Sequence, residues 1–148
     1  MWEGIVGTIL GGVIGFAASY LLTRIQIREA RKVARAQLLL GFDQRLSEFD
    51  KVHQALRPGG SWPRDRDHPP EGMQWSEVEG YMGAFERLNV LLTDRIVSTE
   101  LVKAFYEYRL HNLVANAGIQ DKLKRFPDGW SNFLELCKHL GIEVQVDR

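Results

Sequence analysis

Residues 4–23 read GIVGTILGGVIGFAASYLLT and contain no charged side chain. An apolar helix of about 20 residues is long enough to cross the hydrocarbon core of a bilayer. In water, the five glycines of this stretch would each weaken a helix by about 1 kcal/mol relative to alanine. A bilayer tolerates them because the backbone there must form its hydrogen bonds internally. The stretch therefore predicts a transmembrane anchor rather than a buried helix of a soluble core.

A cleaved signal peptide is the second interpretation of the same stretch. Ala17, Ala18 and Ser19 are small enough to resemble a cleavage site. However, a signal peptide carries its basic residues before the apolar segment, and the residues before this one include Glu3 and no Lys or Arg. We therefore expect the anchor to be retained.

Small residues recur at every fourth position of the predicted anchor, at Gly7, Gly11, Gly15 and Ser19. This spacing places them on one helix face, where a second helix can approach closely and gain van der Waals contact. We predict that the anchor associates with a second copy of the chain or with another transmembrane helix. The alternative is a glycine-rich anchor that stays single.

A basic segment follows the anchor, with five basic side chains and one acid, Glu29, between residues 24 and 35. Basic residues stay on the cytoplasmic side of a membrane and attract anionic lipid. We therefore expect a single-pass protein of the inner membrane with its N-terminus outside and its C-terminal part in the cytoplasm. Nucleic acid is not expected as a partner, because no aromatic residue interleaves with these charges. The basic residues are Arg24, Arg28, Arg31, Lys32 and Arg35.

Three parts are expected: a transmembrane anchor over residues 1–23, a basic juxtamembrane helix over 24–37, and a cytoplasmic domain over 38–148. Apolar residues spaced three and four apart predict helices throughout this domain. The first continues from the anchor to about Leu56, and a capping box, Ser76 with Glu79, opens the second. A third begins at Ser98 and ends at Gly118 or continues to Phe126. The expected fold class is all-α, a single N-terminal transmembrane helix continuing into a small helical bundle.

A long polar connection rich in proline spans residues 57–75. Connections of this length are uncommon in compact domains and are either binding segments or disordered. This one carries three large apolar side chains, Trp62, Met73 and Trp75. They either pack back onto the bundle or contact a partner protein, as exposed aromatic residues often do.

Few residues suggest chemistry. Asp65, Asp67 and His68 are the only close cluster of acids with a histidine, and we interpret it as a solvated loop because metal ligands need rigid support. Cys137 has core spacing, so it is expected to be a buried, unreactive thiol. A single cysteine also forms no disulfide framework. We expect no catalytic residues, no metal and no cofactor.

Two further groups are expected to serve structure. His53 lies on the apolar stripe of its helix and is predicted to be a core or edge histidine. Glu86 and Arg109 lie on helices expected to be neighbours, and we predict an ion pair between them.

The second half of the chain resembles a bacterial family of small membrane-anchored proteins. Four segments carry the resemblance: Tyr81–Asn89, Ile96–Val102, Phe105–Arg109 and Trp130–Glu135. That family is catalogued as a domain of unknown function. The resemblance implies an N-terminal span and a helical cytoplasmic part, and it implies no activity.

The sequence favours a non-enzymatic, membrane-anchored, oligomeric interaction or scaffold protein. Its expected partners are membrane lipid, a second copy or a partner transmembrane helix, and a cytoplasmic protein. The alternative is a membrane-perturbing effector, related to phage proteins or toxins, that acts through glycine-packed spans. A small hydrolase or metal enzyme using Asp65, Asp67 and His68 is a third interpretation.

Overall fold

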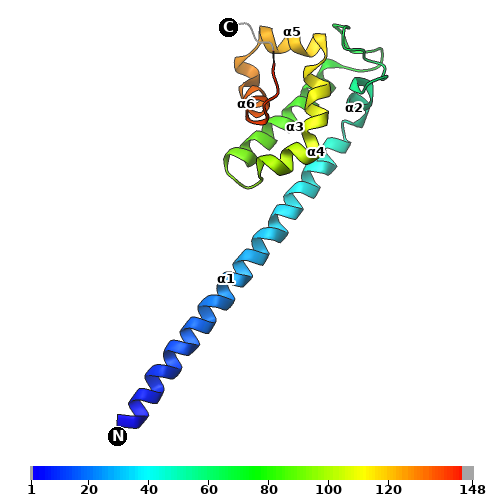
Figure 1. Ribbon diagram of the computed structural model, residues 1–148. Helices are drawn as coiled ribbons and strands as arrows, with labels where there is room; N and C mark the ends of the chain where they lie inside the picture. Colours follow the sequence, from blue (N-terminus) through cyan, green and yellow to red (C-terminus); the bar gives the residue numbers. More distant parts are fainter. Residues whose placement is uncertain (1, 145–148) are drawn as a thin grey trace. The chain divides into compact units, whose positions relative to one another are not determined.

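The computed structural model describes the backbone of residues 2–144 and the side chains of residues 19–144. It contains helices and no strand within that range (Figure 1). The expectation of an all-helical protein is therefore confirmed. The elements are α1 (Trp2–Ser47), α2 (Asp50–Leu56), α3 (Trp75–Thr93), α4 (Thr99–Val114), α5 (Ala117–Arg125), the 3-10 helix η1 (Asp128–Trp130) and α6 (Ser131–Leu140). The chain divides into two compact units, Met1–Leu40 and Gly41–Arg148.

Within the residues that the structure describes, no helix is both long enough and apolar enough to cross a bilayer. This finding contradicts the predicted N-terminal transmembrane helix. Length is not the limiting factor, because α1 has 46 residues. From Arg24 onward charged residues recur along α1. A membrane-perturbing effector would need the same span, so this finding also counts against that alternative.

The first unit is a single helix. All of its described side chains from Ser19 to Leu38 are exposed. Three of the four small residues predicted to form a helix-association face, Gly7, Gly11 and Gly15, lie outside the residues whose side chains are described. Ser19 is exposed, and its carbonyl oxygen accepts a hydrogen bond from the hydroxyl of Thr23 at 2.8 Å.

The core of the second unit is built around α3, which packs against α6. Val78, Tyr81, Met82, Phe85 and Leu88 of α3 are fully buried. Each of these five residues lies three or four positions from another of them, so they form one apolar face of the helix. The apolar spacing that predicts a helix in this segment therefore corresponds to its buried face.

An aromatic cluster fixes the last turns of α1, within the second unit, to α3 and α4. The ring of Phe42 meets Tyr106 of α4 edge-on at 4.9 Å and Phe85 of α3 at 6.1 Å between centroids. Such edge-on pairs contribute about 0.5–1.5 kcal/mol beyond the area they bury. The hydroxyl of Tyr106 donates a hydrogen bond to Asp43 at 2.8 Å.

Helix boundaries in the second unit follow local capping. The Ser98 side chain accepts from the amide of Leu101 at 3.3 Å and opens α4. The Asn116 side chain accepts from the amides of Gly118 and Ile119 and opens α5. Gly141 ends α6 with φ of 75°, a conformation in which glycine carries no steric cost. The Ser98 and Asn116 side chains satisfy amides that a helix start leaves unpaired.

Candidate functional site

The connection between α2 and α3 is held against the bundle, and Trp62 is its anchor. Trp62 is only 1% exposed. Its indole nitrogen donates to the carbonyl of Arg66 at 2.9 Å, and its amide donates to the carbonyl of Ala55 at 2.9 Å. Its ring meets Trp75 edge-on at 5.6 Å. Trp62 was predicted either to pack onto the bundle or to contact a partner protein, and the structure shows that it packs onto the bundle.

The same connection is joined to the start of α5. The amide of Ala117 donates to the carbonyl of Arg64 at 2.7 Å, and the side chain of Asn116 donates to the carbonyl of Pro63 at 3.1 Å. A Cβ atom on Gly118 would overlap the carbonyl oxygen of Asp67. The close approach of the two backbones therefore requires glycine at position 118.

A pocket of about 360 Å³ lies between this connection and α5. Asp67 and His68 line it, together with Trp75, whereas Asp65 is not among its lining residues and is exposed. Its cations have partners: Lys122 pairs with Glu79, its ammonium lies 4.9 Å from the centre of the Trp75 ring, and Arg125 pairs with Asp121 at 2.7 Å. Among the described residues, no three His, Cys, Asp or Glu side chains are grouped so as to hold a metal ion. The cationic side chains that line this pocket are therefore engaged in contacts within the fold.

The other large apolar residues of the connection are less buried than Trp62. Met73 and Trp75 are both half-buried. Part of each side chain is therefore accessible, and their role as contacts for a partner protein stays a prediction.

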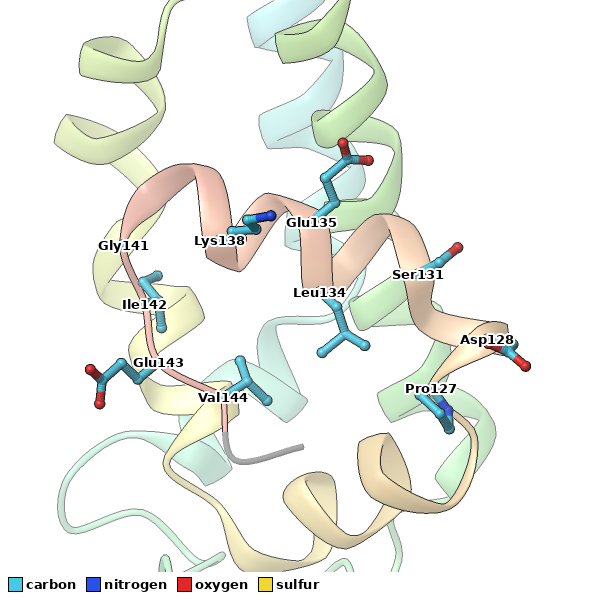
Figure 2. A pocket seen from close by; sticks show the side chains of 10 residues that line it. All are labelled: Pro127, Asp128, Ser131, Leu134, Glu135, Lys138, Gly141, Ile142, Glu143 and Val144. Atoms are coloured by element: carbon cyan, nitrogen blue, oxygen red, sulfur yellow. The ribbon is translucent and has the colours of Figure 1, made fainter. Parts of the chain in front are cut away.

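A larger hollow of about 960 Å³ lies under α6. Figure 2 shows Leu134 of α6 and Ile142 and Val144 of the chain that follows it lining the same space. The lining also includes charged residues of both signs: Asp128, Glu135, Lys138 and Glu143. Apolar walls with charges of both signs suit an apolar group and favour neither a cation nor an anion.

A buried amide connects α3 to α6. The side chain of Asn89, which is 1% exposed, donates to Glu135 at 3.1 Å, and its oxygen lies 3.2 Å from Nδ1 of His139. Glu135 and His139 are one helical turn apart, so one amide contacts both. Because a buried amide costs free energy unless it is hydrogen-bonded, this network favours one register between the two helices.

A polar cluster lies where α2, α3 and α4 meet. Arg109 of α4 lies 3.9 Å from the Asp50 carboxylate of α2. Nδ1 of His53 lies 3.4 Å from the hydroxyl of Tyr81 on α3. Burial raises the pKa of Tyr81 to about 12, so this tyrosine remains a hydrogen-bond donor at neutral pH. His53 is half-buried, as its place on the apolar stripe predicted.

The predicted ion pair between Glu86 and Arg109 is wrong, because Arg109 pairs with Asp50 instead. Burial raises the pKa of Glu86, and a hydrogen bond from the backbone of Phe133 opposes that shift. Glu86 therefore faces α6 rather than α4.

Cys137 is buried in α6, and burial raises the pKa of its thiol to about 12. Thiols react as thiolates, and each unit of pKa lowers the thiolate fraction about tenfold. We expect a disulfide reagent at pH 8 to modify the native protein at least about a thousandfold more slowly than the urea-unfolded chain. Ellman's reagent measures both rates, and equal rates would contradict a buried, unreactive thiol.

The basic residues of α1 are all exposed. Arg24, Arg28, Arg31 and Arg35 are separated by four, three and four residues, so their side chains lie along one face of the helix. We call this face the arginine stripe. Lys32 lies beside it and pairs with Glu29 at 2.8 Å. The stripe therefore presents four cations along about 17 Å of helix.

Comparisons with protein-family models, with curated proteins and with solved structures give no match to this chain. The resemblance to a family of small membrane-anchored proteins stays a prediction.

Proposed function

We propose that this protein is a non-enzymatic interaction module that binds a bilayer surface rich in anionic lipid through the arginine stripe of α1. The observation that carries the proposal is the stripe itself, four exposed arginines on one face of a helix. We place the protein at the cytoplasmic face of the inner membrane, where anionic headgroups attract basic segments.

Electrostatics favours a planar anionic surface as the partner. Each basic residue close to such a surface contributes about 1 kcal/mol. The guanidinium group also binds phosphate in a bidentate geometry that lysine lacks. A second copy of the same segment is a poor partner, because its five basic residues and single acid would oppose like charges.

Apolar side chains flank the stripe. Tyr20, Leu21, Ile25 and Ile27 are each between 48% and 59% exposed. A helix with basic and apolar side chains of this kind binds at the boundary between headgroups and acyl chains, where lysine and arginine keep their charges in water. The exposed apolar side chains next to the arginines would be buried in the bilayer, and this burial would strengthen the binding that begins with charge attraction.

The proposal predicts charge-dependent binding to vesicles. We expect the full-length protein to sediment with phosphatidylcholine vesicles that contain phosphatidylglycerol and to bind pure phosphatidylcholine vesicles much more weakly. Replacing three stripe residues, Arg28→Gln, Arg31→Gln and Arg35→Gln, removes about 3 kcal/mol and should weaken binding on the order of a hundredfold. Raising the salt concentration should weaken the binding of the unmodified protein.

Two controls distinguish the effect of the stripe residues on vesicle binding from the effect of the protein's net charge. Lys32→Gln should weaken binding less than Arg31→Gln, because Lys32 is already paired with Glu29. A triple variant with the same charge change on exposed residues of the second unit, Lys103→Gln, Lys124→Gln and Lys138→Gln, should bind as the unmodified protein does. The proposal would be refuted if the protein bound neutral vesicles as tightly as anionic ones. It would also be refuted if the two triple variants lost the same amount of binding affinity.

A further inference from the structure

His53 occupies the junction of three helices. Its ring nitrogen Nδ1 lies 3.4 Å from the hydroxyl of Tyr81 on α3, and its ring meets Tyr108 of α4 edge-on at 5.7 Å. A neutral imidazole with its proton on Nε2 can accept a hydrogen bond from the Tyr81 hydroxyl at Nδ1, whereas a protonated ring can only donate one. The direction of this hydrogen bond therefore depends on the protonation state of the ring.

The charged groups that face His53 come from two helices. These are Asp50 on α2, Arg57 directly after the end of α2, and Arg109 on α4, whereas Tyr81 is neutral near pH 7. Within the described residues, Nη1 of Arg109 is buried and has no hydrogen-bond partner. A proton on His53 would thus place a second positive charge beside a poorly compensated guanidinium group, with only the half-exposed Asp50 to balance it.

Helix α2 depends on these contacts. It has seven residues, which is too short for a helix to be stable in water by itself. Val52, Ala55 and Leu56 are its buried residues. The carbonyl of Ala55 also accepts the amide of Trp62, so displacement of α2 would loosen the connection that Trp62 anchors.

We propose that α2 is an acid-sensitive latch, which detaches from α3 and α4 when Nδ1 of His53 takes up a proton. Protonation turns Nδ1 into a donor, so it can no longer accept from the Tyr81 hydroxyl, and the new positive charge is repelled by Arg109 and Arg57. The chain between α2 and α3, including Trp62, is released in the same event.

The direction of the pH dependence follows from the pKa of His53. Burial lowers it from its ordinary value of 6.5, and the nearby Arg109 and Arg57 lower it further, whereas Asp50 raises it. The unfolded chain therefore takes up the proton at a higher pH than the folded protein does. The stabilisation is complete above about pH 6.5 and is lost as the pH falls towards the pKa of the folded state.

Hydrogen exchange of the full-length protein tests the latch. After correction for the intrinsic rates, we expect protection of the α2 amides to fall by up to about tenfold per pH unit below pH 6.5. The buried middle of α3 should keep its protection. His53→Gln stays neutral and can still accept the hydrogen bond from Tyr81, so its α2 should show no acid response. His111→Gln, at an exposed position of α4, is the matched control and should respond as the unmodified protein does.

An acid response that persists unchanged in His53→Gln would overturn the latch, as would α2 protection that is equal at pH 7.5 and pH 5.5. A second measurement needs no variant. The NMR titration of the His53 ring should have a lower midpoint in the native protein than in the urea-unfolded chain, and an equal or higher midpoint would also overturn it.

Discussion

Replacing Trp62 with alanine is expected to lower the free energy of unfolding by about 3–5 kcal/mol, the range observed when a fully buried large aromatic residue is truncated. Trp62 is 1% exposed and contacts Trp75 edge-on. Its removal leaves a cavity, and it also leaves the carbonyl of Arg66 without the hydrogen bond that the indole nitrogen donates. Urea denaturation of the full-length protein, followed by circular dichroism, measures the loss.

The control for this prediction is Phe126→Ala. Phe126 is also an aromatic residue near the α2–α3 connection, but it is 59% exposed. Its truncation should change the free energy of unfolding by no more than about 0.5 kcal/mol, as expected for surface substitutions. If Trp62→Ala costs no more than Phe126→Ala, the connection is not anchored to the bundle and Trp62 is free to contact a partner.

The helical periodicity of the sequence correctly predicts much of the core. Val78, Tyr81 and Phe85 recur at three and four residues, and they are all buried in the structure. Such predictions succeed because one apolar face per helix is a local property of the sequence. They do not fix where a helix begins, since that depends on which residues are free to cap it.

Two helix boundaries illustrate this limit. The predicted capping box at Ser76 and Glu79 is displaced, because α3 begins at Trp75 and Glu77 accepts the hydrogen bond from the amide of Gln74 at 2.8 Å. The helix that was expected to run unbroken to Leu56 ends at Ser47. Neither Glu48 nor Phe49 is a helix breaker, so the sequence contains no local signal for this end.

The candidate sites were harder to predict than the core. Arg109 pairs with Asp50 rather than Glu86, because the relative rotation of three helices decides which acid it meets. The arginine stripe depends only on the positions of four arginines along one helix, and these positions can be read from the sequence. The predicted transmembrane helix rested on the length and the lack of charge of residues 4–23, and it is contradicted by the finding that no described helix is both long and apolar enough to span a bilayer.

Gly118→Ala is expected to lower the free energy of unfolding. Overpacking costs about 1–3 kcal/mol, and we expect a loss near the upper end of that range. The added methyl group would overlap the backbone carbonyl of Asp67. A backbone atom moves only if its whole segment moves, so either the connection between α2 and α3 or the first turn of α5 must shift. That shift would also strain the hydrogen bond between Ala117 and Arg64.

Gly83→Ala provides a control of opposite sign. Gly83 lies inside α3, and a Cβ atom there would meet nothing within 4 Å. Because alanine is a better helix former than glycine by about 1 kcal/mol, this variant should be more stable than the unmodified protein. Urea denaturation of both variants gives the comparison. A stabilised Gly118→Ala would show that the connection does not approach α5 closely, and the pocket lined by Asp67, His68 and Trp75 would then have no fixed shape.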